Sequence, residues 1–167
     1  MDEINWWAVT QKLGPQLFRF FRCRFGTVDA EEPVQEVFLR LVDKVESNSF
    51  FASKGSPEAL AWGIALNVQR EHRRYLAKNA VPTDQPSIDT ISDPIQFDHS
   101  AQQEIAALLR SVRILTEPQR TIMGMVLADL SLDEISAAFA MPAGTIKSHV
   151  HRAKEEIRKT FKHWRML

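Results

Sequence analysis

The amino-acid sequence predicts an all-α fold in which two small helical domains are joined by an extended acidic linker. Apolar residues recur at helical spacing through most of the 167 residues, and no segment shows the sustained alternation typical of a strand. Residues 79–99 contain three prolines and four aspartates without a helical period, which indicates a linker. Residues 131–158 have the pattern of a helix-turn-helix. The predicted domains therefore span 1–78 and 100–167.

The N-terminal domain is expected to begin with two helices, over residues 4–13 and 15–25. The dipeptide Gly14-Pro15 is taken as the break between them, because proline removes a backbone hydrogen bond from a helix interior. A third helix is expected to start at Asp29 as its N-cap, with Pro33 near its first turn. Its apolar positions follow helical spacing and are Val34, Val37, Phe38, Leu41, Val42 and Val45.

A fourth helix is predicted from Ser56-Pro57 to about Lys78, following a loop. Beyond the linker, apolar spacing over residues 105–115 predicts one helix, and Thr116 with Gln119 forms a capping box for the next. These assignments make the helix-turn-helix the last part of an all-helical C-terminal domain.

The helix-turn-helix is the most informative segment of the chain. Ser131 and Glu134 form a capping box at the start of its first helix, and Pro142 marks the turn. The second helix buries one apolar stripe, made of Ile146, Val150, Ala153 and Ile157. Its opposite face collects Gly144, Thr145, Ser148, His151 and Arg152, flanked by Lys147 and His149. A helix face with small residues near its N-terminus and basic residues further along fits the DNA major groove. The alternative is a helix pair with a solvated charged face.

The charge distribution supports contact with nucleic acid although the net charge of the chain is zero. Residues 66–78 carry four Lys or Arg against one Glu, a net of +3, and residues 141–167 carry seven against two, a net of +5. The stretch 79–100 carries four aspartates and no Lys or Arg, a net of −4. Two basic surfaces separated by an acidic segment are expected where both surfaces touch phosphates.

Several function classes are not supported by the sequence. No apolar run approaches the ~20 residues of a membrane span, and Cys23 stands alone, which favours a reducing, cytoplasmic setting and a packed core thiol. His149 and His151 are two residues apart on a helix, so they do not share a metal ion, and no metal or cofactor is expected. The motifs of an enzyme, such as a phosphate-binding glycine loop, are missing from the sequence.

Three segments together resemble the bacterial RNA polymerase sigma factors of the sigma-70 family, in the extracytoplasmic-function subgroup. They are LFRFFRCRFGTVDAEEPVQEVFLRLV (17–42), IALNVQREHRR (64–74), and LTEPQR (115–120) with LSLDEISAAFAMPAGTIKSHVHRAK (130–154). The last is the most specific of the three. The resemblance implies a protein that binds core RNA polymerase, directs it to promoter DNA and assists melting. It also implies an anti-sigma factor as a partner, because compact sigma factors of this type commonly have one.

The resemblance implies roles for three groups of residues. The helix-turn-helix would read the distal promoter element, with Arg152, His151, Ser148 and Thr145 towards bases and Lys147, His149 and Lys154 towards phosphates. The melted element would be held by Phe50, Phe51, Asn67, Arg70, Arg73, Arg74 and Lys78, although either phenylalanine could instead be a core residue. Polymerase would dock on Gln35, Glu36, Leu39, Arg40 and Asp43.

Some residues depart from the family pattern. Leu60 stands at a position where tryptophan is common, with Trp62 shifted by two, and Ala140 stands where a glycine usually ends the first helix of the DNA-binding pair. If Ala140 adopts a left-handed conformation, it costs ~1 kcal/mol. The rival interpretation is a helix-turn-helix regulator that binds duplex DNA without polymerase, since TIKSH also resembles such regulators.

Overall fold

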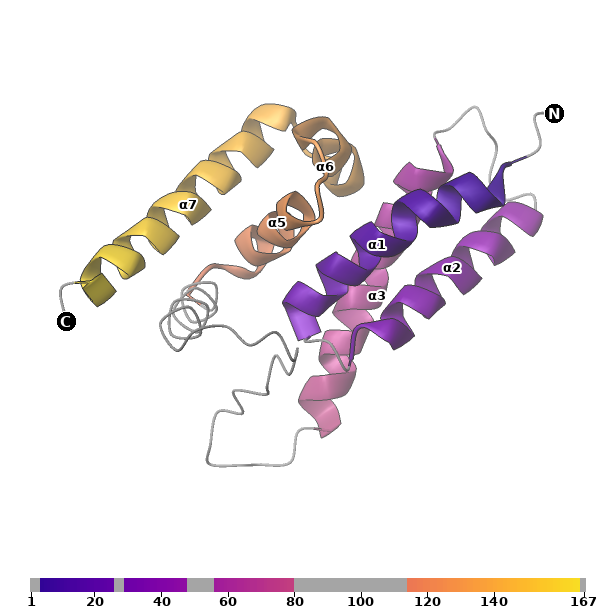
Figure 1. Cartoon of the computed structure of the whole chain (residues 1–167), viewed down its shortest axis with the longest axis horizontal. Helices are drawn as coiled ribbons and strands as arrows, with labels where there is room; N and C mark the ends of the chain where they lie inside the picture. The colour runs from indigo at the N-terminus through magenta and orange to yellow at the C-terminus, as the bar shows by residue number, and fades with distance from the viewer. Residues whose placement is uncertain (1–3, 26–28, 48–55, 80–113, 166–167) are drawn as a thin grey trace.

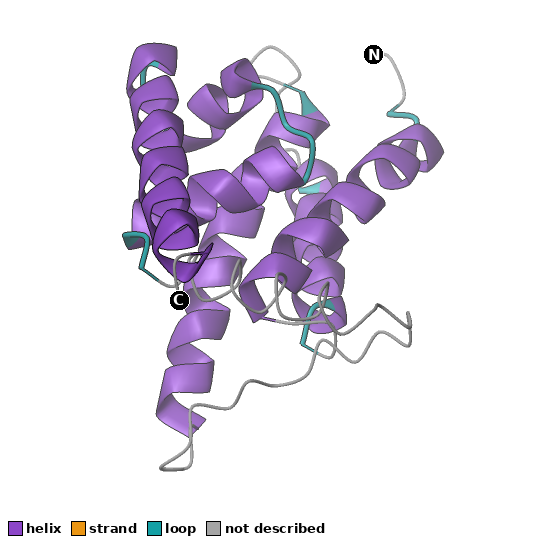
Figure 2. Cartoon of the chain, turned by 60° about the vertical axis from the view of Figure 1, so that its left-hand side comes forward, coloured by secondary structure: helices purple, strands orange, loops and turns teal. Residues whose placement is uncertain are grey.

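The computed structural model describes residues 4–25, 29–47, 56–79 and 114–165, with side chains as far as residue 160. Within these residues every regular element is a helix, so the predicted all-α class is confirmed (Figure 2). The helices are α1 (Trp6–Phe25), α2 (Glu31–Glu46), α3 (Pro57–Asn79), α5 (Glu117–Leu127), α6 (Leu132–Phe139) and α7 (Ala143–Arg165). The linker at 80–99, the helix predicted over 105–113, and both Phe50 and Phe51 lie outside the described residues.

The helices form two neighbouring groups. Helices α1, α2 and α3 lie side by side, and α5, α6 and α7 make the second group (Figure 1). Helix α5 packs against α1 and helix α6 packs against α3, so the two groups touch along a shared seam. We call this contact the inter-half seam. The domain boundaries at 78 and 100 stay a prediction.

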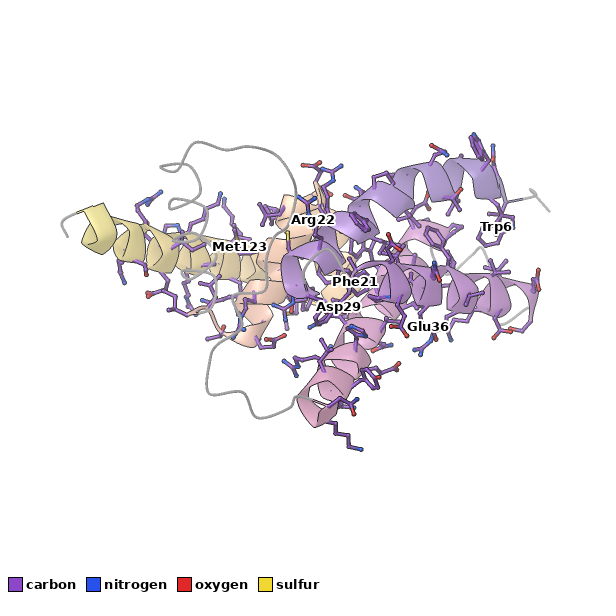
Figure 3. All side chains as sticks on the ribbon, turned by 60° about the horizontal axis from the view of Figure 1, so that its bottom comes forward. Trp6, Phe21, Arg22, Asp29, Glu36 and Met123 are labelled. Carbon is purple, nitrogen blue, oxygen red and sulfur yellow. The ribbon has the colours of Figure 1, made fainter. Side chains whose placement is uncertain are left out.

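One continuous hydrophobic core runs through both groups of helices. Phe20, Phe21 and Trp62 belong to the same cluster as Met125 and Ile135 of the second group. The Phe20 ring meets the rings of Phe21 and Trp62 edge to face, with centroids 5.1 and 5.5 Å apart. Phe21 lies among the helices in Figure 3. Burying a side chain of this size contributes about 1.5–3 kcal/mol, so the apolar stripes explain most of the stability.

Helix α1 is continuous, and the predicted break at Gly14-Pro15 is wrong. Pro15 lies inside the helix and is exposed, while Leu13 and Leu17 on either side of it are fully buried. Proline in a helix interior costs ~3 kcal/mol or more. A single apolar stripe running across this point offsets that cost, because breaking the helix would turn one set of leucines away from the core.

The start of α2 also differs from the prediction. The N-cap is Ala30, which makes no side-chain capping bond, and Asp29 lies exposed in the preceding turn. Pro33 is then the third helical residue, whose amide would have no partner inside the helix in any case. Pro33 therefore removes no hydrogen bond and is buried instead. Cys23 was expected in the core and is exposed, a third correction to the sequence-based expectation.

The remaining helix starts follow the predicted caps. The Ser56 hydroxyl accepts from the Ala59 amide at 3.2 Å, at the start of α3. The Gln119 side-chain oxygen accepts from the Thr116 amide at 3.0 Å, and Ser131 forms its reciprocal capping box with Glu134. The two hydrogen bonds from Ser131 lower the pKa of Glu134. These local bonds fix where α5 and α6 begin.

Candidate nucleic-acid and polymerase interfaces

Helix α7 presents the predicted small and basic face to solvent. Ile146 and Ala153 are fully buried against the rest of the second group, which turns the opposite side of the helix outwards. The exposed side chains are Thr145, Lys147, Ser148, His151, Arg152 and Lys154. Within the described part of the chain, no carboxylate pairs with Lys147, Arg152 or Lys154; Glu155 and Glu156 pair with Arg158 and Lys159 instead. The cations of this face are therefore available to an anion.

His149 differs from its neighbours on α7. Its side chain is half-buried, and its Nδ1 is buried without a hydrogen-bond partner among the described residues. Ser148 donates its hydroxyl to the Gly144 carbonyl at 3.0 Å and keeps its lone pairs for a further donor. Six of the seven predicted groove residues are therefore exposed, and His149 is half-buried.

A left-handed residue sets the direction in which α7 leaves the turn. Ala140 ends α6 with φ 51° and ψ 40°, the left-handed region that favours glycine. The Met141 amide donates to the Ser136 carbonyl at 3.1 Å, and the Ile146 amide donates to the Pro142 carbonyl at 3.2 Å. These bonds close the turn around Ala140, which has the left-handed conformation that the sequence analysis gave as a condition for a cost of ~1 kcal/mol.

The basic end of α3 is engaged by other side chains, unlike the face of α7. Arg70 donates to Asn67 at 3.3 Å, and Arg73 pairs with Glu117 of α5 at 3.0 Å. The charge of Arg74 helps to lower the pKa of Glu71. Asn67, Arg70, Arg73, Arg74 and Lys78 are all exposed. The predicted set is therefore split, with Arg73 directed to the second group of helices and the others on open surface.

The five predicted polymerase-binding residues lie on the outer side of α2. Leu39 is 67% exposed, and Val42, three residues further along the helix, is 36% exposed. Arg40 joins this surface to α3: it donates to both carboxylate oxygens of Glu71, at 3.1 and 2.7 Å, and to Glu36 at 2.6 Å. The Arg40 hydrogen bonds are the main reason that the pKa of Glu71 is lowered, and the two glutamates raise the pKa of Arg40. Gln35 and Asp43 are exposed on the same helix.

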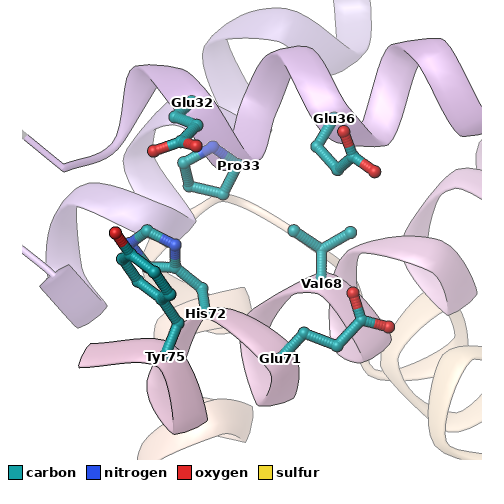
Figure 4. Close-up of a pocket in the computed structure, with 7 residues that line it drawn as sticks. All are labelled: Glu32, Pro33, Glu36, Val68, Glu71, His72 and Tyr75. Carbon is teal, nitrogen blue, oxygen red and sulfur yellow. The ribbon is translucent and has the colours of Figure 1, made fainter. Parts of the chain in front are cut away.

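A shallow hollow of about 210 Å³ lies between α2 and α3 beside this surface (Figure 4). Glu32, Glu36 and Glu71 line it together with His72 and Tyr75, whose rings stack with centroids 6.3 Å apart. Arg40 already pairs with Glu36 and Glu71, so Glu32 and the two rings are the lining groups that suit a cationic side chain of a docking protein. It extends the Leu39 surface towards α3.

A cluster of polar side chains crosses the inter-half seam. Glu117, at the start of α5, accepts hydrogen bonds from Arg24 of α1 and, at 3.2 Å, from Gln69 of α3, and it forms an ion pair with Arg73 at 3.0 Å. Arg120 lies 3.9 Å from the other Glu117 oxygen. We call this group the Glu117 hub. A second ion pair across the seam joins Arg19 of α1 to Asp129 of the turn after α5.

Comparisons with known proteins agree with this geometry. The family model "Sigma-70, region 4" matches residues 105–157, which contain α5, α6 and most of α7. The chain is 29% identical to the extracytoplasmic-function sigma factor RpoE of Cereibacter sphaeroides over 163 residues, covering 95% of this chain and 87% of that protein. It is 25% identical to SigE of Mycolicibacterium smegmatis over 161 residues, covering 92% of this chain and 60% of SigE.

Two solved structures share the fold. CnrH, solved in complex with the cytosolic domain of CnrY, matches with a TM-score of 0.67 and 16% identity, over 93% of this chain and 86% of CnrH. The sigma factor RpoE of Bartonella quintana, solved with the anti-sigma factor NepR, matches with a TM-score of 0.68 and 20% identity, over 95% of this chain and 97% of RpoE. By these comparisons the chain is similar to extracytoplasmic-function sigma factors over nearly its whole length.

The region 4 match can be placed on the two groups of helices. The region 4 match covers the helix-turn-helix and also Glu117, so the hub joins region 4 to the first group of helices. Among the described helices, none has the length and apolar character that crossing a bilayer requires. The sequence did not predict the roles of Arg24, Gln69 and Glu117, because partners 93 and 48 residues apart leave no local signal.

Proposed function

We propose that this chain is a transcription initiation factor that binds core RNA polymerase, directs it to promoters and assists DNA melting. The observation that carries the proposal is the exposed face of α7, small at its start and cationic further on, within a matched sigma-70 region 4. An α-helix with this face fits the major groove, where Arg152 can pair with guanine and Lys147 or Lys154 with phosphates. The chain would act in the cytoplasm and without catalysing a reaction of its own.

The proposal divides the work between the two predicted domains. Residues 1–78 would dock on polymerase and hold the melted element, and residues 100–167 would read the distal element. The Leu39 surface supports docking, because an exposed leucine beside the acidic hollow offers an apolar anchor with a polar rim. The related complexes of CnrH with CnrY and of RpoE with NepR support an anti-sigma factor as a further partner.

Run-off transcription tests the proposal directly. Purified core polymerase, this chain and a pool of genomic promoter fragments are mixed, and the transcripts are sequenced. The expected result is initiation at a small set of promoters that share a distal sequence. Sequence-specific binding of the chain alone to duplex DNA, with no transcript in the presence of polymerase, would instead establish the independent regulator.

A matched pair of variants tests the docking surface. Leu39→Ala removes an exposed apolar side chain from the proposed surface, and Trp7→Ala removes one that is 72% exposed at the start of α1. Leu39→Ala is expected to weaken binding to core polymerase by about fivefold, or about 1 kcal/mol. Trp7→Ala is expected to leave that affinity unchanged. Equal losses for the two variants would remove Leu39 from the docking surface.

A further inference from the structure

The Glu117 hub is built like an anion-binding site whose anion is supplied by the chain itself. Its donors come from two helices of the first group, Arg24 from α1 and both Gln69 and Arg73 from α3. The acceptor, Glu117, comes from the second group, at the start of α5. All three donors reach the same carboxylate oxygen, so α1 and α3 together define a single point at which negative charge is bound.

Arg24 is the deeply placed member of the site. Its side chain is only 7% exposed, and its Nε is buried without a partner among the described residues. Burial lowers the pKa of Arg24, and Glu117 acts in the opposite direction. A buried guanidinium that loses its anion is strongly unfavourable, so an anion must stay at this point or Arg24 must reach water.

The packing around the hub holds Glu117 in place only while the two groups of helices touch. Gly124 of α5 lies so close to Phe20 of α1 that an added Cβ would be 3.2 Å from the ring. The same Cβ position is 3.8 Å from the side chain of Arg24. Glu117 and Gly124 belong to one helix, so α5 carries both the anion and the close contact. Any movement of α5 away from α1 therefore withdraws Glu117 from Arg24.

The donors fit phosphate as well as they fit a carboxylate. Guanidinium groups form parallel hydrogen bonds to either anion, and an amide N–H adds a neutral donor. Arg73 also belongs to the cationic end of α3, where Arg70 and Arg74 lie on open surface within one helical turn. A phosphate at the hub would continue that basic surface towards α1.

We propose that Arg24, Gln69 and Arg73 form a binding site for a nucleic-acid phosphate, and that Glu117 occupies this site while the two halves are packed together. The inference rests on the proposed function in one respect, which is that DNA supplies the phosphate. Phosphate and Glu117 then compete for one set of donors. Binding of the DNA backbone at this point and contact between α1 and α5 exclude one another.

The first test compares two carboxylates that cross the same seam. Glu117→Gln removes the charge that fills the site, and Asp129→Asn removes the charge that pairs with Arg19 outside it. Asparagine tolerates the left-handed conformation of Asp129, whose φ is 63°, so the control keeps the turn. Binding of the full-length chain to a labelled 20-base-pair duplex of random sequence is measured by fluorescence anisotropy over a range of salt concentrations.

Glu117→Gln is expected to tighten binding of this duplex by about threefold or more beyond Asp129→Asn. It is also expected to steepen the dependence of log K on log salt by about one, the slope of one additional phosphate contact. The double variant Arg24→Gln with Glu117→Gln should return both quantities to the wild-type values. Equal affinities for Glu117→Gln and Asp129→Asn would overturn the proposal.

A second test opens the seam without changing any charge. Gly124→Leu places a side chain against Phe20 and is expected to separate the halves, seen as a larger radius of gyration in X-ray scattering with unchanged helical circular dichroism. The duplex affinity should rise as it does for Glu117→Gln. Separated halves without a gain in affinity would contradict the proposal. If either variant loses its helical circular dichroism signal, the proposal is tested by NMR on the wild-type chain. The Arg24 Nε–H resonance should shift when duplex is added. An unchanged resonance would overturn the inference.

These outcomes separate the inference from the proposed function. Run-off transcription by wild-type chain with core polymerase reports on the function alone. Transcription together with equal duplex affinities for Glu117→Gln and Asp129→Asn would reject the phosphate site and keep the function. A gain specific to Glu117→Gln without transcription would keep the site and reject the function.

Discussion

The two cationic surfaces of this chain, on α3 and on α7, differ in what their charges already bind. On α7, Arg152 and Lys154 project into solvent with no carboxylate beside them in the described structure. On α3, Arg73 is paired across the seam, and Arg74 lies close enough to Glu71 to lower its pKa. The two segments have a similar density of positive charge in the sequence. The cations of α7 are available to an anion, whereas the availability of Arg73 on α3 depends on whether the two groups of helices are in contact.

The largest loss of promoter binding is expected when a single cationic residue of α7 is replaced by alanine. Arg152→Ala should cost ~1–3 kcal/mol of promoter binding and relax one base position, because a bidentate contact to a base edge is lost. Lys154→Ala should weaken all sequences alike and flatten the salt slope by about one. Both are measured by selection from a randomised promoter library with the assembled holoenzyme. An equal loss on every sequence for Arg152→Ala would remove it from the base-reading residues.

A smaller effect is expected at the turn that directs α7. Ala140→Gly should raise the free energy of unfolding by about 1 kcal/mol, because glycine adopts φ 51° without the clash that alanine suffers. Urea unfolding followed by circular dichroism measures this change. Ala137→Gly, inside α6 and exposed, is the matched control and should lower the stability by about 1 kcal/mol. A loss of stability in both variants would show that the left-handed residue is not strained.

Two of the arginines of α3, Arg73 and Arg70, are expected to differ in what they contribute to the free energy of unfolding. Arg73→Ala breaks an ion pair with Glu117 whose members are 48% and 33% exposed, so about 0.5 kcal/mol of unfolding free energy is expected to be lost. Arg70→Ala removes only a contact with Asn67 on the same helix and should change the stability by less than that. Both variants should weaken binding of the holoenzyme to promoter DNA. Equal unfolding midpoints would mean that Arg73 is as free as the cations of α7.

The smallest effect is a pH dependence that comes from the contact between α2 and α3. Hydrogen bonds from Arg40 hold the pKa of Glu71 below its ordinary value of 4.5. The stabilisation is therefore fully present above about pH 4.5 and is lost as pH falls through the lower, folded-state pKa. Glu71→Gln should flatten the fall in urea midpoint over that acidic range. Arg40→Gln should flatten it equally, and a steeper fall in either variant would contradict the assignment.

The features that the sequence predicted correctly are those that short stretches of chain determine. The capping boxes at Ser131 and Thr116 need only residues three positions apart, and the exposed face of α7 follows from the spacing of Ile146 and Ala153. The left-handed conformation of Ala140 was raised as a condition, because a glycine usually stands at this position in the family that the sequence resembles. In each case the physical cause lies within one or two helical turns.

The features that the sequence missed depend on distant partners. The break predicted at Pro15 ignored the core that holds α1 together, and the cap assigned to Asp29 ignored how tightly Pro33 packs. The Glu117 hub could not be inferred, because a glutamate early in a helix is already explained by the helix dipole. The contacts of Glu117 with α1 and α3 can be recognised only once these helices are placed beside α5. The roles assigned to the DNA-binding and polymerase-binding residues stay predictions.

The proline inside α1 has a mechanical consequence. Because Pro15 has no amide hydrogen, the backbone hydrogen bond to the Gln11 carbonyl is missing, while the helix itself continues through this point. The segment after Pro15 carries Phe20 and Arg24, which lie near Gly124 of α5, and the segment before it carries the buried Val9 and Leu13. A bend in α1 is therefore expected to concentrate at Pro15, between the segment that meets α5 and the N-terminal turns.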